Sequence, residues 1–209
     1  WKSKYNNRIV SSFDPDLGTV DNICGMSLQT DGKLLVIAGN CPGPFGQWPN
    51  MRLARLLPDG SQDPDFDTPV RSTSGLCTVK ALPDGRILVG GNIVYFDGND
   101  FVFRGLCRLL PDGSIDPSFD VQPGTIEGPG SSYPGTSVAL ANGSVISGIT
   151  TLSVALPDGT MDPNFTPVTV TGPWDPWVRA VVEQEDGQII IAGRFTACNG
   201  IPQARIARL

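Results

Sequence analysis

The decapeptide Leu110-Pro111-Asp112-Gly113-Ser114-Ile115-Asp116-Pro117-Ser118-Phe119 decides the fold of this sequence, because it recurs along the chain. Close copies occupy positions 57–66 and 156–165, and a degenerate first copy survives as Ser12-Phe13-Asp14-Pro15. Such recurrence indicates that one structural unit is used several times, so the repeat has to be interpreted before any single residue.

A second repeated element precedes each decapeptide and has the pattern of a β-hairpin. Its first copy reads MSLQTDGKLLV from Met26, and further copies begin at Val79, Ser137 and Val181. A β-rich run, an Asp-Gly or Asn-Gly pair and a β-branched run form the strongest short-range hairpin signal. We expect both central residues of each turn to have φ > 0, which Asp, Asn and Gly tolerate best. The expected turn residues of the two elements are Asp31, Gly32, Asp59, Gly60, Asp84, Gly85, Asp112, Gly113, Asp158, Gly159, Asp186 and Gly187.

Each unit is expected to contain four short antiparallel strands. The hairpin supplies two strands, a third follows a variable loop, as at 51–56 and 204–209, and the decapeptide leads into a fourth. The Asp-Pro pair in this last segment removes a backbone donor, which an outer edge strand tolerates and a central strand does not. A four-stranded sheet repeated every ~40–50 residues is typical of a β-propeller.

The two elements together resemble the delta-sixty repeat, a bacterial β-propeller-like repeat. Its consensus runs roughly A-L-Q-x-D-G-K-I-L-V-G-G-x-F and then R-x-x-R-L-x-x-D-G-S-x-D-x-x-F. Residues 27–39 and 206–209 match it, as do 187–195 with Asn199-Gly200, while the third unit departs from it at Asn142 and Ile149. The resemblance implies large exported or surface proteins of mostly unassigned function, and it supplies no catalytic residues.

We therefore predict an all-β fold of the β-propeller type, in which four repeats each form a four-stranded antiparallel blade. One domain is expected over 1–209, with modules at about 13–66, 67–119, 120–165 and 166–209. Residues 1–12 would close the ring or pair elsewhere. The four blades fit a small closed ring or an arc of a larger propeller. Because the sequence lacks an initiator Met, we expect a fragment or a processed chain.

Composition and charge narrow the classes of function. The formal net charge of -6 and the scattered Lys and Arg argue against nucleic-acid binding. The chain has no His, which removes His-based acid–base chemistry, the usual nucleophilic triads and most catalytic zinc sites. No apolar run approaches the roughly 18 residues that a membrane span needs. Cys41 and Cys198 lie in predicted loops as disulfide candidates, but the sequence does not pair them.

The candidate binding residues are aromatic side chains in the variable loops. Strand connections alternate between the two faces of a propeller, so we expect both Asp-Gly turns on one face and the variable loops on the other. Binding residues commonly lie on loops of a rigid scaffold, and aromatic side chains supply much of the contact energy at recognition sites. A protein or glycan partner is expected to contact Trp48, Tyr95, Phe101, Tyr133, Trp174 and Trp177.

The decapeptide also raises the question of calcium. Asp112, Ser114, Asp116 and Ser118 present alternating oxygen donors, as calcium loops do. The bidentate carboxylate that normally ends such a loop is not placed here, and turn formation by Asp and Gly explains the same residues more simply. No cofactor and no metal are expected, with calcium as the alternative.

We predict a non-catalytic module, secreted or on the surface of a bacterial cell, that binds or assembles through its variable loops. One alternative is a structural subunit that joins further propeller modules, or copies of itself, through an open blade edge. The other is a carbohydrate-active enzyme. It would need two suitably spaced acids, drawn from Asp97, Asp100, Glu127 and Asp175.

Overall fold

The computed structural model describes residues 15, 17, 22–39, 51–72, 76–121 and 136–209. Trp48 and Tyr133, two of the predicted binding residues, lie outside these ranges, as do Cys41 and Glu127. The described residues form β-strands and turns, without a helix. In this part of the chain, therefore, no apolar helix reaches the length needed to cross a membrane.

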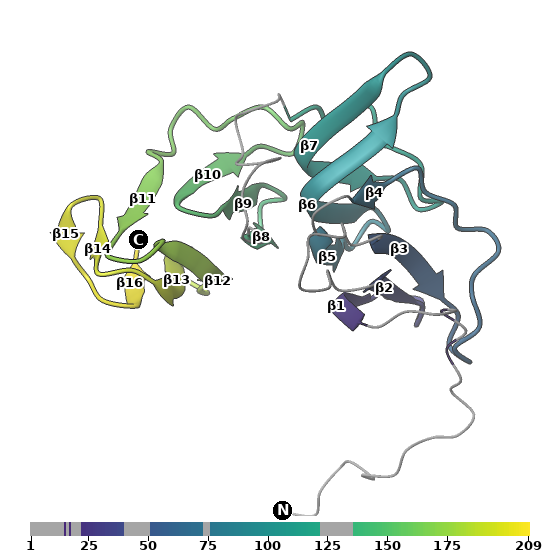
Figure 1. Ribbon diagram of the computed structural model, residues 1–209, viewed down its shortest axis with the longest axis horizontal. Coiled ribbons are helices and arrows are strands. Elements are labelled where there is room, and N and C mark those ends of the chain that lie inside the picture. Colours follow the sequence, from purple (N-terminus) through teal and green to yellow (C-terminus); the bar gives the residue numbers. More distant parts are fainter. Residues whose placement is uncertain (1–14, 16, 18–21, 40–50, 73–75, 122–135) are drawn as a thin grey trace, which may run out of the picture.

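Four groups of antiparallel strands follow one another along the chain, and we call them the first to fourth units. The first two units contain β1 (Asn22–Leu28), β2 (Leu34–Gly39) and β3 (Met51–Leu56), then β5 (Leu76–Ala81), β6 (Ile87–Phe96) and β7 (Phe101–Leu109). The last two contain β8 (Thr136–Ala139), β9 (Val145–Gly148) and β10 (Thr151–Ala155), then β12 (Trp177–Glu183), β13 (Ile189–Arg194) and β16 (Ile206–Arg208). The units follow an arc, and their first strands lie along its inner side (Figure 1).

Short strands connect neighbouring units. β4 (Arg71–Ser72) pairs with β3 of the first unit and β6 of the second. β11 (Val168–Thr171) likewise pairs with β10 of the third unit and with β14 (Ala197–Cys198) of the fourth, which turns into β15 (Ile201–Pro202). Hydrogen-bonded sheet therefore continues from one unit into the next at these two junctions.

The Asp-Gly turns form where they are predicted, but the expectation of two residues with φ > 0 is wrong. Glycine has positive φ in each of them, from 80° at Gly187 to 98° at Gly113, and the Asp residues do not. In the first turn the Gly32 amide donates to the Gln29 carbonyl at 3.1 Å. This is a type I turn followed by one left-handed glycine. The Asp side chain caps the loop instead, since Asp31 Oδ1 accepts the Lys33 amide at 3.1 Å.

The predicted fourth strand is much shorter than expected. After the second Asp-Gly turn the chain makes only an isolated bridge, which joins Leu56 to Gln62 in the first unit. The next residue, Asp63, accepts the Asp65 amide on Oδ1 at 3.0 Å, and the chain turns away. Only then does β4 pair with the other end of β3. An Asp that caps a turn and a Pro without an amide hydrogen therefore divide the outer strand into two pieces.

Most of the described core lies between the units, and one further cluster, made of Leu17, Val36, Ala38 and Leu56, lies against the first unit alone. Leu35, Ile37 and Leu53 of the first unit pack against Val79 and Val89 of the second. Equivalent clusters join the second unit to the third through Leu88, Leu106, Val145 and Ala155, and the third to the fourth through Ile146, Leu152, Val181, Ile189 and Ile191. Each strand alternates its side chains between two faces, so one unit contributes to two such cores.

Candidate functional site

The second unit carries a long hairpin that extends β6 and β7 beyond the rest of their sheet (Figure 1). Cross-strand pairs place Phe96 opposite Phe101 and Tyr95 opposite Val102. The four-residue tip is fixed by its first residue, because Asp97 Oδ1 accepts the amides of Asn99 and Asp100, both at 2.9 Å. The sequence places this segment in a variable loop, whereas the structure shows a regular ribbon with defined faces.

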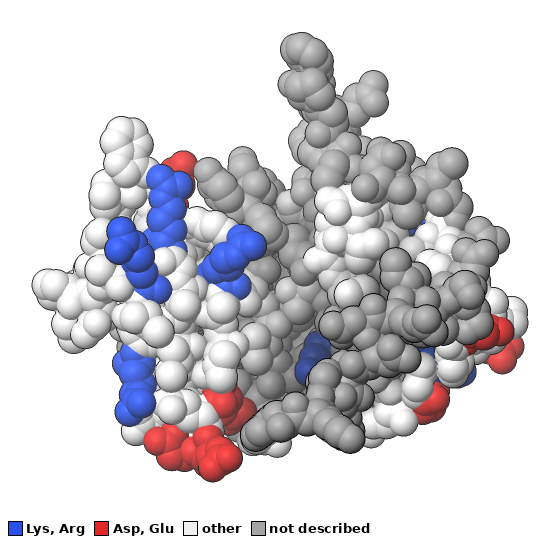
Figure 2. Space-filling model, turned by 90° about the horizontal axis from the view of Figure 1, so that it is seen from below, with Lys and Arg blue, Asp and Glu red and all other residues white. Residues whose placement is uncertain are grey.

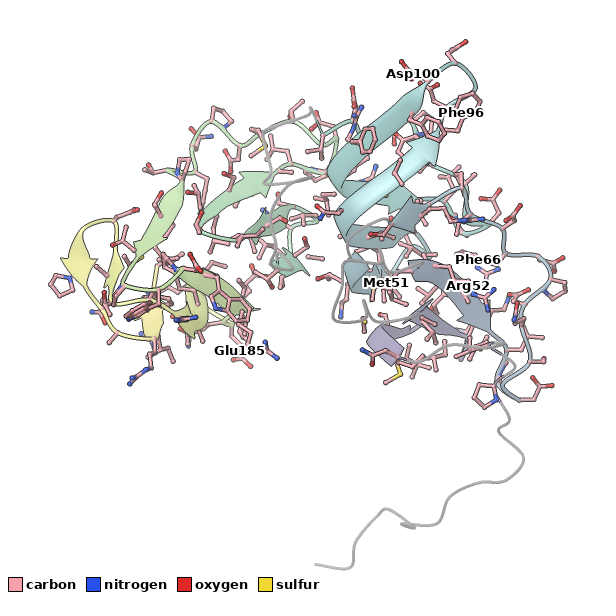
Figure 3. The ribbon with its side chains drawn as sticks, in the orientation of Figure 1. Met51, Arg52, Phe66, Phe96, Asp100 and Glu185 are labelled. Carbon is pink, nitrogen blue, oxygen red and sulfur yellow. The ribbon has the colours of Figure 1, made fainter. Side chains whose placement is uncertain are left out.

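One face of this hairpin is aromatic and open to solvent. Phe101 and Phe103 alternate along β7 and lie opposite Phe96 and Val94, so all four side chains share a face. Phe96 is 55% exposed, Phe101 is 65% exposed and Phe103 is 49% exposed. The rings of Phe96 and Phe101 are 5.6 Å apart at their centres, and Figure 3 shows Phe96 and Asp100 at the end of the hairpin. We call these three side chains the phenylalanine face.

A cleft of about 440 Å³ lies beside the phenylalanine face, where the hairpin meets the decapeptide of the same unit. Tyr95, on the opposite side of the ribbon, is partly buried against the core, and this burial raises the pKa of its hydroxyl. The tyrosine is therefore neutral at physiological pH and can donate a hydrogen bond. The cleft is lined by Pro69, Tyr95, Phe96, Asp97, Ile115, Asp116, Pro117, Phe119 and Asp120.

The mouth of the cleft carries the Asp97 carboxylate and an ion pair between Asp120 and Arg104. Backbone hydrogen bonds from Asp100 and Asn99 lower the pKa of Asp97, so this side chain is ionised at neutral pH. The Asp120 carboxylate is largely exposed and lies 3.6 Å from the guanidinium of Arg104. An aromatic wall with acids at its rim suits a ligand that combines apolar and cationic groups.

A buried ion pair supports the floor of the cleft. Arg108 Nε lies 2.7 Å from Asp116 Oδ2, and both side chains are almost fully buried. The guanidinium carbon of Arg108 lies 4.6 Å from the ring centre of Phe119, which is one of the residues that line the cleft. Burial alone would raise the pKa of Asp116, but hydrogen bonds from Ser118 and Arg108 outweigh it and lower the pKa to about 2.

The oxygen donors considered for calcium are used inside the decapeptide. Asp112 Oδ1 accepts the amide and the hydroxyl of Ser114, at 2.9 and 2.7 Å. Asp116 Oδ1 accepts the amide and the hydroxyl of Ser118 in the same way, at 2.9 and 2.6 Å. Among the described residues, no three His, Cys, Asp or Glu side chains are grouped so that they could hold a metal ion.

The predicted binding residues fall into two separate places. Tyr95 and Phe101 belong to the β6–β7 hairpin. Trp174 belongs to the connection between β11 and β12 and Trp177 begins β12, on the opposite arm of the arc (Figure 1). Trp174 is 78% exposed and has φ of 67°, whereas Trp177 is partly buried beneath Arg179, 5.4 Å from the ring centre.

The acids considered for catalysis are also divided. Asp97 and Asp100 share the hairpin tip, while Asp175 lies in the β11–β12 connection with φ of 48°. Cys198, a disulfide candidate, is buried in β14, and burial raises the pKa of its thiol.

Sequence reasoning missed two features of the site. Phe103 has the period-two spacing from Phe101 that marks one face of a strand, and this signal could have been found. The ion pair between Arg108 and Asp116 could have been suspected, because Arg55 and Asp63 recur at the same spacing in the first unit. In that unit Arg55 Nε lies 2.8 Å from Asp63 Oδ2.

Comparison with known proteins supports the repeat and its fold. A family described as a domain of unknown function (DUF5122) beta-propeller matches residues 43–66, 82–119 and 184–209, together less than half of the chain. A search of curated proteins gave no match. The chain is also similar to a crystal structure of a protein of unknown function from Bacteroides caccae, with 11% identity and a TM-score of 0.47. That alignment covers 90% of this chain and 60% of the other.

The matched segments contain the repeated turns and third strands on which the predicted architecture rests. They agree with the helix-free antiparallel sheets of the structure. The chain is therefore an all-β protein of the β-propeller type.

Proposed function

We propose that this protein is a non-catalytic binding module and that its partner docks on the phenylalanine face of the β6–β7 hairpin. The observation that carries the proposal is the exposure of Phe96, Phe101 and Phe103 on one side of a paired β-ribbon. Burying one such side chain contributes about 1.5–3 kcal/mol. A contiguous exposed aromatic patch of this kind is typical of an interaction surface.

The partner is an extended protein segment with apolar and basic side chains. The phenylalanine rings offer an apolar surface without hydrogen-bond donors, which suits aliphatic or aromatic side chains better than sugar hydroxyls. Asp97 lines the adjoining cleft and Asp100 stands at the hairpin tip, so negative charge borders the apolar surface, while Asp120 is paired with Arg104. Lysine or arginine beside the apolar residues of the partner would complement these charges.

A peptide selection tests this proposal directly. Random peptides displayed on phage are selected against the purified chain, and the enriched peptides are synthesised and titrated by fluorescence anisotropy. We expect enrichment of apolar residues flanked by Lys or Arg, and a loss of affinity of at least about tenfold in Phe101→Ala/Phe103→Ala. Ile201→Ala is the matched control, since Ile201 is 64% exposed on a different hairpin and its loss should leave binding unchanged.

Two results would overturn the proposal. One is a selection without enrichment, and the other is peptides that bind the double variant as tightly as the unchanged chain. Binding to a glycan array that disappears in Trp174→Ala but persists in Phe101→Ala/Phe103→Ala would instead assign the function to the β11–β12 connection.

The proposed location is outside the cell or on its surface. The resemblance of the repeat to exported and surface proteins of the delta-sixty type supports this location. Digestion of intact cells with a protease tests it, since a surface protein is cleaved and one retained inside the cell is protected.

A further inference from the structure

We propose that the cleft beside the phenylalanine face binds a proline-rich part of the partner segment, in the polyproline II conformation, with a Lys or Arg of that segment next to Asp97. The assignment rests on the proposed function, since it gives the composition and the conformation of the same partner where it enters the cleft. The observations behind it are the residue types that line the cleft and the hydrogen bonds that those residues already form.

The walls of the cleft have the residue types that accommodate proline rings. Tyr95 and Phe96 belong to β6, and Phe119 belongs to the decapeptide of the same unit. Two exposed prolines, Pro69 and Pro117, also line the cleft. Grooves lined by aromatic side chains bind proline-rich segments, because flat rings pack against pyrrolidine rings and the segment is already extended before it binds. The volume of about 440 Å³ lies within the range of known ligand sites.

The carboxylates on the floor and rim of the cleft favour a partner without backbone amide hydrogens. Asp116 Oδ2 is paired with Arg108, and its Oδ1 accepts the amide and the hydroxyl of Ser118. Asp120 is paired with Arg104. Acceptors that are already engaged offer little to a further N–H group, and an amide buried without an acceptor costs free energy. Proline has no amide hydrogen, so it enters this cleft without that loss.

The hydroxyl of Tyr95 supplies the complementary donor. Burial raises its pKa, so it is protonated at neutral pH, and it forms no hydrogen bond within the described residues. It can therefore donate to a backbone carbonyl of the bound segment. The carbonyl groups of a polyproline II segment form no internal hydrogen bonds and remain available. A single donor among apolar side chains would fix the position of the segment along the cleft.

The carboxylate of Asp97 determines the charge that the segment should carry. Its Oδ1 holds the hairpin tip by accepting the amides of Asn99 and Asp100. Asp97 is exposed, and no Lys or Arg of the described residues forms a salt bridge with it. A Lys or Arg beside the prolines of the partner can therefore pair with this carboxylate.

Positive charge on this protein lies away from the cleft. Figure 2 shows basic side chains gathered over the fourth unit, on the other arm of the arc, and the exposed arginines of that unit are Arg179, Arg194, Arg205 and Arg208. A cationic segment is thus attracted to the β6–β7 hairpin and repelled from the fourth unit. This difference favours the cleft over the β11–β12 connection as the place where a basic, proline-rich segment binds.

Two labelled peptides test the proposal by fluorescence anisotropy with the whole chain. The probe is Arg-Pro-Pro-Leu-Pro-Pro-Leu, and its control peptide replaces each proline by alanine while it keeps the charge and both leucines. We expect the probe to bind at least about tenfold more tightly than the control peptide. The reason is that the probe has fewer amide hydrogens to bury and loses less conformational freedom on binding.

Variants of the chain locate the bound probe. Tyr95→Phe removes only the hydroxyl and should weaken binding of the probe about threefold to tenfold. Asp97→Asn keeps an acceptor for the hairpin tip, removes the charge and should weaken binding about threefold. Asp186→Asn is the matched control, since Asp186 is exposed on the fourth unit and its replacement should leave the affinity unchanged. Circular dichroism melting checks that every variant is folded.

The proposal is overturned if the probe binds no more tightly than the control peptide, or if Tyr95→Phe and Asp97→Asn bind it as the unchanged chain does. The proposed function fails on different evidence, because its selected peptides depend on Phe101 and Phe103. Selected peptides that need those two phenylalanines, together with a probe that Tyr95→Phe binds unchanged, would leave the proposed function standing and exclude a proline-rich segment from the cleft.

Discussion

Arg108 donates from Nη1 to the carbonyl oxygen of Pro157, 49 residues further along the chain, at 2.6 Å. Its Nε is paired with buried Asp116 in its own unit, so one side chain binds the outer turn of the second unit and the decapeptide of the third. Arg55 repeats the arrangement with Asp63 and Pro111. The buried arginines therefore link the first unit to the second and the second to the third, whereas Val154 stands at this position in the third unit.

Arg108→Met should destabilise the fold by about 3 kcal/mol, because it removes the buried cation from Asp116 and leaves only Arg86, whose guanidinium lies 3.5 Å from the carboxylate. Urea unfolding followed by fluorescence measures the loss. Arg208→Met is the matched control. Arg208 is exposed at the equivalent position, so its replacement should lower the free energy of unfolding only slightly. Arg108→Met/Asp116→Leu should recover much of the stability. A loss in Arg108→Met no larger than in Arg208→Met would contradict the structure.

Stability should fall between about pH 4 and pH 2. The pKa of Asp116 is about 2 in the folded chain, below its ordinary value of 3.8, so the unfolded chain binds the proton first as pH falls. The ion pair's contribution is complete above the unfolded pKa and is lost as pH falls through the folded one, on the order of 2 kcal/mol. Urea midpoints at successive pH values measure this loss. The stability of Asp116→Asn should decline less steeply as pH falls. An equal decline in both proteins would contradict the attribution of this pH dependence to Asp116.

The repeat predicted most of the fold because it is a local signal. The Asp-Gly pairs locate the hairpins, and alternating apolar residues such as Leu35 and Ile37 locate the strands between them. What the sequence did not show is which partner each polar side chain finds. Arg55 reaches a carbonyl 56 residues away, and no periodicity within one unit indicates that contact.

The candidate site was predicted in part for a related reason. Tyr95 and Phe101 were expected to bind because they are aromatic residues in a region where the repeats differ. The regular pairing of Phe96 with Phe101 was not anticipated, since the long β6–β7 hairpin has no equal in the other described units. Where a segment differs from the repeat, the alternation of apolar and polar residues within that segment has to be examined, because it can indicate a strand instead of a loop.

Gly113→Ala should destabilise the fold more than Gly187→Ala. Both glycines have positive φ, 98° and 80°, so each substitution carries the strain of a left-handed alanine. A Cβ on Gly113 would in addition lie 2.4 Å from the Asp67 carbonyl oxygen of the preceding unit, while nothing lies within 4 Å of one on Gly187. Thermal melting of the two variants measures the difference. Equal losses of stability in the two variants would mean that Gly113 does not lie as close to the Asp67 carbonyl as the structure shows.

The two thiols of Cys24 and Cys107 should differ greatly in reactivity in the native protein. Cys107 is buried in β7, and burial raises the pKa of its thiol to about 12, so almost no thiolate forms at neutral pH. Cys24 is exposed on β1. Iodoacetamide labelling followed by peptide mass spectrometry should therefore modify Cys24 within minutes and Cys107 only after urea is added. Rapid native labelling of Cys107 would show that the junction between the first two units opens, since Cys107 belongs to the core that joins them.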